Sequence, residues 1–568
     1  MTDSSYEHIL LRAEWQQALF SERLSRRKLR ALVPTWPCRP IRVRVHRNHA
    51  FEFVSSALAP FLAFSRLAAE LSIGDYDDAL TLSVSGPSDV EIVWLDYDRY
   101  SGTIDQKDLA DWLVGRMQVL RSRSDAPILL LDRVGASEAV VGFNQRLREA
   151  AEQVAGLRVC PQSGIEAQLK AAYFDDRMVE LAGTRVSQAA SLQTARALGL
   201  RWIPSVVQAR LKAVIFDLDH TLWAGVLGED GIDGVAVTAG HAALQRHAVE
   251  LASEGIFLGL ASKNEDADVV RLFAQRGGEL PLSLEHVSAR AVSWEPKAQG
   301  VRAIIDQLRI GADAVLFVDD NPGELAAVGG SLAGIWTLQA SSDAAETLRG
   351  LQHHPGLLRW TEDATDRLRA ADLAASELRS SQLASATDPT AYLASLRVTL
   401  GRMVDPVAHR ARLHALSNKT NQFNLALRRF GEAEVDRRLS DPATPVVAIS
   451  LADRLADSGL VGVLFTRVSG SQLVVEELCV SCRALGRGLD DALVTAALMA
   501  VCAAHPAVEQ VVFDFSTGPR NAPARSWLAG FVGRPLGAEA GSVSTPWQAQ
   551  ARMSMLSALP IQIEDRET

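Results

Sequence analysis

The chain has 568 residues, which at about 150 residues per domain predicts three or four domains and excludes one compact core. Hydrophobic residues make up 48% and charged residues 22%, a globular composition that excludes collagen-like and intrinsically disordered classes. Acidic residues outnumber basic residues by 68 to 58, and the net charge of −10 argues against a nucleic-acid partner, because phosphate backbones require a positive surface.

The targeting features of the sequence predict a cytoplasmic protein without a membrane segment. The longest apolar run, residues 492–504, is shorter than the roughly 20 residues that a membrane-spanning helix needs, so it predicts a buried helix. The amino-terminal residues MTDSSYEH lack the basic and apolar stretches of a signal peptide. Five cysteines are few and odd in number, which fits a reducing compartment and excludes a disulfide scaffold.

The first section, residues 1–208, alternates predicted strands with amphipathic stretches, as an open α/β domain does. The predicted elements are strands at 41–45, 90–95, 127–131 and 157–160 and a helix at 138–154. A serine hydrolase would have Gly-Asp-Ser after its first strand, whereas HRNHAF follows here. A docking or scaffold role is therefore favoured over catalysis.

In the second section, residues 209–340, three short apolar runs end at polar side chains. Residues 213–216 precede Asp217, residues 256–261 precede Ser262, and residues 314–318 precede Asp319. Strands that are buried on both faces have continuous apolar sequences, and ligands bind at the carboxyl ends of such parallel strands. We therefore expect the three polar clusters to meet in one crevice.

The sequence FDLDHTLW contains the candidate catalytic carboxylates of this crevice. Asp217 can attack phosphorus to form an aspartyl-phosphate, and Asp219 can protonate the leaving oxygen and then activate water. Carboxylates this close together need a cation, and Mg²⁺ prefers oxygen ligands. The predicted metal ligands are Asp217, Asp219, Asp319 and Asp320.

Ser262 is predicted to bind the phosphoryl oxygens, and Lys297 in WEPK to neutralise their charge. This order of motifs resembles the haloacid dehalogenase (HAD) superfamily over residues 211–338. Further candidates for phosphate binding inside the motifs are Thr221, Lys263 and Asn264. The 35 positions between Ser262 and Lys297 leave no room for a large inserted cap, so the site is open or is covered by another part of the chain.

A helical connector is predicted at residues 341–393, with the Asp-Pro-Thr of residues 388–390 as a helix stop. The third section, residues 394–568, has predicted strands at 446–451, 459–468 and 473–480. The sequence SCRALGRG follows the last of these strands. It has the form R-x-x-G-x-G, which resembles the acyl-coenzyme-A loop of GNAT acetyltransferases, where glycines let the backbone approach an anion.

Two cysteines lie close to this loop. Cys479 and Cys482 make a poor zinc or redox pair, because residues three apart on a strand face opposite sides. Two alternatives stay open: an inert buried cysteine, or a nucleophile at Cys482 whose thiol pKa is lowered by Arg483, Arg487 and the loop amides.

Upstream of the loop, the sequence SNKTNQFNLALRR is too polar for a core helix. It predicts either a surface loop or, as we favour, a binding site for an anionic substrate. The candidates for acyl or pantetheine binding are Lys419, Asn421, Gln422, Asn424, Arg483, Gly486, Arg487 and Gly488.

Taken in order, DLDHTLWAGVLGEDG, ASKNEDA, SNKTNQFNL, DRLADSGLVGVL and SCRALGRG resemble the FkbH-like glyceryl transferase/phosphatase family of polyketide biosynthesis. The resemblance implies an α/β fold with three domains. These are an SGNH-hydrolase-like domain that lacks an identifiable catalytic serine and histidine, an HAD-like Rossmannoid domain without a large cap, and a GNAT-like α+β domain. His220 and Ala224 depart from the asparagine and glycine that are usual at these positions, and they affect loop shape more than chemistry.

The resemblance also implies a two-step use of 1,3-bisphosphoglycerate. Cys482 would hold the phosphoglyceryl group as a thioester, the Asp217 site with Mg²⁺ would remove its phosphate, and the glyceryl group would pass to the phosphopantetheine thiol of a holo acyl carrier protein. Two alternatives stay open: a plain Mg²⁺-dependent phosphatase acting on another phosphate ester, and a scaffold that binds a carrier protein.

Overall fold

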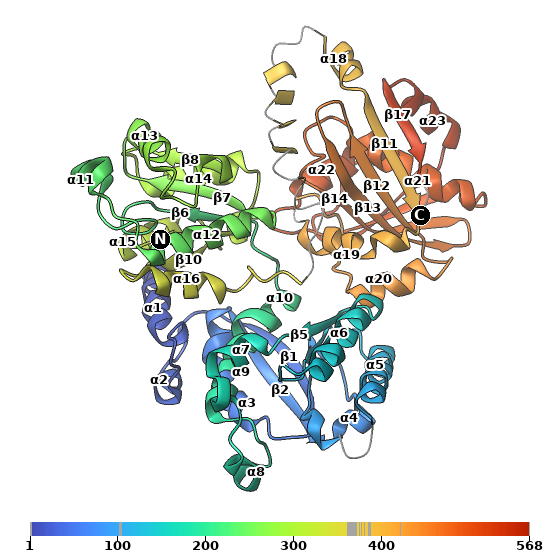
Figure 1. Ribbon diagram of the computed structural model, residues 1–568. Coiled ribbons are helices and arrows are strands. Elements are labelled where there is room, and N and C mark those ends of the chain that lie inside the picture. The colour runs from blue at the N-terminus through green and yellow to red at the C-terminus, as the bar shows by residue number, and fades with distance from the viewer. Residues whose placement is uncertain are drawn as a thin grey trace. The chain divides into compact units, whose positions relative to one another are not determined.

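Figure 1 shows the computed structural model, which describes residues 3–100, 105–360, 388–420 and 422–566 and scattered positions between 368 and 383. The chain divides into two compact units, Met1–Glu362 and Asp363–Thr568. The described residues form two parallel five-stranded sheets in the first unit and a mixed seven-stranded sheet in the second. The predicted α/β class is confirmed.

The first sheet of unit 1 has the strand order β2-β1-β3-β4-β5, with all pairs parallel. Its strands are β1 (Arg39–Arg47), β2 (Leu67–Tyr76), β3 (Val90–Trp94), β4 (Ile128–Leu131) and β5 (Leu157–Cys160). The surrounding helices are α1 (Asp3–Leu19), α2 (Arg26–Arg30), α3 (Glu52–Phe64), α4 (Asp78–Thr81), α5 (Gln106–Arg123), α6 (Glu138–Gln153), α7 (Ser163–Leu169), α8 (Arg177–Ala182), α9 (Gln188–Arg196) and α10 (Ile203–Val207). Strand β2 is not among the predicted strands.

Alternate residues of the central strands face opposite sides of this sheet, and both sides are apolar. Ile92 and Trp94 of β3 pack with α3 and α9, whereas Val93 packs with α5 and α6. Figure 1 shows these two helical layers with the sheet between them. Because every face of the central strands is buried, their sequences are continuous apolar runs, which is why they could be predicted.

The second sheet has the order β10-β9-β6-β7-β8 and is also fully parallel. Its strands are β6 (Ala213–Phe216), β7 (Phe257–Ser262), β8 (Val287–Val292), β9 (Val315–Asp319) and β10 (Trp336–Gln339). The helices that follow its strands are α11 (Leu227–Gly234), α12 (Ala239–Ser253), α13 (Asp266–Arg276), α14 (Lys297–Gln307), α15 (Pro322–Ser331) and α16 (Ala344–Gln352). Strands β6, β7 and β9 match the three predicted strands to within one residue, and the edge strands β8 and β10 are additional.

Helix α1 joins the two sheets of unit 1. Arg12 lies 4.4 Å from the ring centre of Phe64 and 5.3 Å from those of Trp36 and Trp336, and its two terminal nitrogens are buried without a hydrogen-bond partner among the described residues. Cation–π attraction from three rings therefore replaces an ion pair here. Gly329 of α15 lies so close to α1 that a Cβ atom there would collide with Ile9. One hydrophobic cluster runs through both sheets, so the predicted boundary between residues 208 and 209 falls inside one compact unit.

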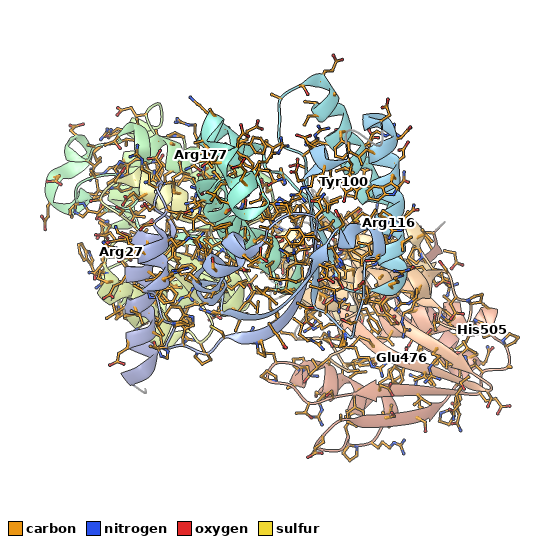
Figure 2. The ribbon with its side chains drawn as sticks, turned by 90° about the horizontal axis from the view of Figure 1, so that it is seen from below. Arg27, Tyr100, Arg116, Arg177, Glu476 and His505 are labelled. Carbon is orange, nitrogen blue, oxygen red and sulfur yellow. The ribbon has the colours of Figure 1, made fainter. Side chains whose placement is uncertain are left out.

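The sheet of unit 2 has the order β16-β15-β14-β13-β12-β11-β17, in which β14–β15 and β11–β17 are parallel and the other pairs are antiparallel. Its strands are β11 (Val398–Val404), β12 (Val446–Ala452), β13 (Asp457–Ser469), β14 (Gln472–Val480), β15 (Gln510–Phe515), β16 (Gly541–Pro546) and β17 (Ile561–Asp565). Its helices are α18 (Pro389–Leu396), α19 (Arg410–Lys419), α20 (Glu432–Leu439), α21 (Asp490–Ala504), α22 (Ala522–Val532) and α23 (Ala549–Ser557). Glu476 on β14, labelled in Figure 2, forms ion pairs with Arg438 and Arg467.

The predicted connector, residues 341–393, contains α16 and the start of α18, and its described positions between 368 and 383 are also helical. Its first part forms α16, which packs on α12 within unit 1, and residues 361–367 and 384–387 lie outside the described residues. The Asp-Pro-Thr sequence begins a helix that was not predicted, and the residues before it, 384–387, where the predicted helix would stop, lie outside the described residues. The Asp388 side chain accepts a hydrogen bond from the Thr390 N–H at the start of α18, and Pro389 takes the first helical position, where no N–H is needed.

Among the described helices, none is both long enough and apolar enough to cross a bilayer.

Candidate functional site

The predicted phosphoryl-transfer residues meet at the carboxyl edge of the second sheet. Asp217 directly follows β6, Ser262 ends β7 and Asp319 ends β9. Strand β6 lies between the other two and pairs with both in parallel register. The residues that follow the three apolar runs therefore meet at one edge of the sheet, as predicted.

Lys297 connects two of the carboxylates. Its Nζ lies 2.9 Å from Asp217 Oδ2 and 2.7 Å from Asp319 Oδ2, and all three side chains are buried. Lys297 is the first residue of α14, so the helix start directs its ammonium toward the strand ends. The compact ammonium thus contacts both carboxylates at once.

The carboxylates at this edge of the sheet outnumber the ammonium groups. Burial, followed by the charge of Asp217, raises the pKa of Asp319 to about 7. Burial raises the pKa of Asp217 despite the charge of Lys297 and hydrogen bonds from Lys297 and Ser262. The pKa of Lys297 is raised because the two carboxylates outweigh the opposing effect of burial. One ammonium is thus shared by two buried carboxylates, and a further cation would relieve their repulsion.

The donor set fits a hard divalent cation such as Mg²⁺. Carboxylate oxygens of Asp217, Asp319 and Asp320 lie within 4.8 Å of one another. Asp217 Oδ1 is buried and has no hydrogen-bond partner among the described residues. Oxygen ligands alone suit Mg²⁺, and an unpaired buried carboxylate oxygen is costly unless a cation or a donor reaches it.

The Asp219 carboxylate does not belong to this three-carboxylate group and has hydrogen-bond partners of its own. It accepts hydrogen bonds from Asn264 Nδ2 at 2.7 Å, from Trp223 Nε1 at 2.9 Å and from the Leu227 N–H at 3.0 Å. Of the four predicted metal ligands, the three-carboxylate group thus contains Asp217, Asp319 and Asp320. The three donors fix the Asp219 side chain two residues after Asp217, where an acid/base group is needed.

The predicted phosphate-binding residues differ in their placement. Ser262 and Asn264 are buried, with the Asn264 amide 3.2 Å from the Ser262 hydroxyl. The Thr221 hydroxyl is buried without a hydrogen-bond partner among the described residues, so it is free to bind a phosphoryl oxygen. Lys263 is directed toward α15, where its Nζ lies 2.6 Å from Glu324 Oε1, and its side chain is 44% exposed.

The turn after β6 explains one departure from the family pattern. His220 has a φ of 55°, in the left-handed region, where histidine, like asparagine, is enriched. Trp223, the next large residue, donates to Asp219 and is fully buried. Its positioning role was missed from the sequence, although an indole four residues after Asp219 was a usable signal.

In unit 2, Cys482 lies just beyond the end of β14 and is partly exposed, whereas Cys479 within β14 is buried. Burial, followed by the charge of Glu477, raises the pKa of the Cys479 thiol well above its ordinary value. Cys479 thus stays a neutral, inert thiol, and Cys482 is the cysteine of this pair that a reagent can reach.

The predicted glycine loop has the backbone that its glycines imply. Gly486 and Gly488 have φ angles of 76° and 68°, which disfavour residues with a Cβ atom. A Cβ atom at either position would meet no other atom within 4 Å, so the backbone there faces open space. The glycines are required by conformation rather than by crowding.

The helix that follows the loop carries acids at its start. Asp490 and Asp491 lie in the first turn of α21, and Trp527 Nε1 donates to Asp491 Oδ1 at 2.8 Å. Burial, followed by the charge of Asp491, raises the pKa of Asp490. Acids in a first turn satisfy the positive end of the helix dipole themselves, which makes this end less favourable for a diphosphate than the motif alone predicts.

The two arginines of the loop contact protein groups. Arg483 Nη2 donates to the Leu460 carbonyl at 3.2 Å. Arg487 forms ion pairs at 3.0 Å with both Asp372 and Asp453. The Arg487 guanidinium is therefore engaged with carboxylates of the chain itself.

The polar sequence before the loop forms a turn beside β14. Asn424 is fully buried; its side chain accepts from the Leu427 N–H at 2.8 Å and donates to the Ser417 carbonyl. Gln422 is exposed, Lys419 ends α19, and Asn421 lies outside the described residues. The Asn424 amide is thus used by the fold, and Glu477 accepts four backbone N–H groups that hold the same turn, from Leu425, Ala426, Arg428 and Leu478.

Family models and curated proteins give no match to this chain. Among solved structures, the chain is similar to the N-terminal part of the protein BF1531 from Bacteroides fragilis, which contains a phosphatase domain and was crystallised with Mg. The two are 18% identical over 63% of this chain and 99% of that chain, with a TM-score of 0.49. N-acetylglutamate synthase from Neisseria gonorrhoeae, in complex with coenzyme A and N-acetyl-glutamate, is 10% identical over 77% of this chain and 92% of that chain, with a TM-score of 0.15.

Proposed function

We propose that the chain is a bifunctional glyceryl transferase and phosphatase. It captures the phosphoglyceryl group of 1,3-bisphosphoglycerate as a thioester on Cys482 and removes the remaining phosphate at the Asp217 site. It then delivers the glyceryl group to the phosphopantetheine thiol of an acyl carrier protein for polyketide biosynthesis. The observation that carries the proposal is the presence in one chain of a buried carboxylate–lysine site and a partly exposed thiol on a glycine loop.

The phosphatase half uses Asp217 as the nucleophile. A carboxylate oxygen of Asp217 attacks phosphorus, the ester oxygen leaves, and Asp219 supplies the proton that this oxygen takes up. Asp219 then removes a proton from the water that hydrolyses the aspartyl-phosphate and releases inorganic phosphate. Its three N–H donors hold the carboxylate in place for both proton transfers.

Lys297 and the neighbouring hydroxyls complete this half. The ammonium would balance the charge on the phosphoryl oxygens, and the buried hydroxyls of Ser262 and Thr221 would donate hydrogen bonds to them. Asp217, Asp319 and Asp320 would hold Mg²⁺, which supplies further neutralisation of charge on the transferring phosphoryl group.

The transferase half uses thioester chemistry. The Cys482 thiolate attacks the acyl carbon of the acyl phosphate, the C–O bond to phosphate breaks, and phosphate leaves with the electron pair. In the second transfer the pantetheine thiolate attacks the thioester carbon, and Cys482 leaves as the thiolate. The acids at the start of α21 and the engaged Arg487 favour a pantetheine arm over the diphosphate of free coenzyme A as acceptor.

Intact-mass spectrometry with 1,3-bisphosphoglycerate tests the proposal. The wild-type chain is expected to carry a glyceryl adduct, Cys482→Ala none, and Asp217→Asn a heavier adduct that keeps its phosphate. Cys38→Ala, which removes another partly exposed cysteine, is the matched control and is expected to behave as wild type.

An adduct on Cys482→Ala equal to that of wild type would show that another group carries the acyl chain. Phosphate release from a small ester without an adduct on any variant would leave a plain Mg²⁺-dependent phosphatase. Capture of a carrier protein without turnover would leave a scaffold.

A further inference from the structure

Three contacts attach the loop that carries Cys482 to the start of β13. The Ser481 N–H donates to the Val461 carbonyl at 2.7 Å, and Arg483 Nη2 donates to the Leu460 carbonyl. Arg487 Nη2 donates to the Ser458 hydroxyl at 2.8 Å. The thiol therefore lies in a loop that is fixed on both sides, and Arg487 is its last fixed point before the helix.

Arg487 belongs to a buried group of four charges. Its Nη1 lies 3.0 Å from Asp453 Oδ2 and its Nη2 lies 3.0 Å from Asp372 Oδ1. Arg379 Nε lies 2.8 Å from the same Asp453 oxygen. The Ser458 hydroxyl donates to Asp372 Oδ1 at 2.8 Å. Two arginines balance two aspartates, and the four side chains are each less than 10% exposed.

The group joins segments that are distant in sequence. Asp453 and Ser458 come from the DRLADSG motif, whereas Asp372 and Arg379 come from the connector that precedes the sheet of this unit. Asp372 precedes Arg487 by 115 positions. Asp372 and Arg379 are both in helical conformation, and the side chains of both belong to the same charged group.

We propose that Asp372 and Arg379 of the connector position the Cys482 loop through this four-charge group and are positioning residues for the thiol. This inference rests on the proposed role of Cys482, but the effect of the four-charge group on the loop can be measured without acyl transfer. Removal of one member of a buried, balanced group leaves its partner unpaired, which is strongly destabilising locally. The loop is then expected to open more often and to increase the exposure of Cys482, which is partial in the intact loop, while distant parts of the chain keep their structure.

Alkylation of the full-length protein by iodoacetamide, followed cysteine by cysteine with peptide mass spectrometry, tests this. Asp372→Asn is expected to raise the alkylation rate of Cys482 by about tenfold or more. Cys38 in unit 1 provides the internal reference and is expected to keep its rate, and the buried Cys479 and Cys502 report on the fold of unit 2. Hydrolysis of p-nitrophenyl phosphate is expected to stay unchanged.

Two variants complete the experiment. Asp565→Asn removes an exposed ion pair with Arg402 in the same unit and is expected to leave Cys482 unaffected. Asp372→Glu keeps the charge and is expected to restore most of the protection. A Cys482 rate within twofold of wild type in Asp372→Asn overturns the proposal. An equal rise at Cys479 and Cys502 also overturns it, because that pattern marks general unfolding of the unit.

Discussion

At the carboxyl edge of the second sheet three carboxylates lie together and one lysine pairs with two of them, whereas around the Cys482 loop two arginines are matched by two aspartates. The first arrangement is short of positive charge and leaves a buried carboxylate oxygen unpartnered. The second has two arginines facing two aspartates, so its charges balance, although Arg379 Nη1 and Nη2 have no hydrogen-bond partner among the described residues. The difference indicates that the phosphoryl site depends on a cation from solution, while the thiol loop depends on contacts within the chain.

Removal of the metal by chelation is expected to give the largest difference between the phosphoryl site and the Cys482 loop. With EDTA in excess, phosphate release from a small ester should fall by about 10³-fold, because the three carboxylates lose the cation that they need. Re-addition of Mg²⁺ should restore release, and the alkylation rate of Cys482 should not change in either condition. Undiminished release in EDTA would remove the basis for a metal at Asp217.

Acid is expected to weaken unit 1. Burial lowers the pKa of both His49 and His354 to about 3. Each histidine is thus neutral when folded and takes up a proton on unfolding below its ordinary pKa of about 6.5. Stability is therefore full above that pH and is lost as pH falls, by about 1.4 kcal/mol per histidine between pH 7.5 and 5.5.

Tryptophan fluorescence during denaturant unfolding measures this loss, because most tryptophans lie before residue 362. His49→Asn keeps a side-chain amide that can bond Thr184, the present partner of His49 Nδ1, and should remove one histidine's share of the loss. If His49→Asn loses as much stability between the two pH values as wild type, His49 is not the titrating group.

Gly486→Ala is expected to cost about 1 kcal/mol in the unfolding free energy of unit 2, because alanine is strained at a φ of 76° although space is available. Chemical denaturation measures the change. Gly530→Ala, at a glycine in α22 that also has open space, is the control and should not destabilise. Equal effects at the two positions would argue against a conformational role for Gly486.

The smallest effect is expected for Lys263→Ala. Its ammonium pairs with Glu324 at the surface, so kcat/KM for a small phosphate ester should change by less than about threefold, in line with the small energies of exposed ion pairs. Steady-state kinetics measures it, with Lys297→Ala as the contrasting variant. A loss of kcat/KM comparable to that of Lys297→Ala would instead indicate that Lys263 binds phosphate.

The sequence predicted the elements whose burial leaves a simple signature. Strands β6, β7 and β9 are buried on both faces and therefore have continuous apolar sequences, and the residues after them mark the site. Strand β2 was missed because it is an edge strand with largely exposed side chains. The charged group around Arg487 was out of reach, because nothing local in the sequence indicates that Asp372 meets an arginine 115 positions away.

The three aromatic rings around Arg12 limit the positions at which recombination could divide this chain. Trp336 lies in β10 of the second sheet, whereas Trp36 precedes β1 of the first sheet and Phe64 ends α3 beside it; helix α1 brings Arg12 between them. Recombination that divided the chain near residue 209 would expose these aromatic side chains to solvent in both parts. We expect the two parallel sheets to be inherited together, with breakpoints tolerated after residue 362, where one compact unit ends.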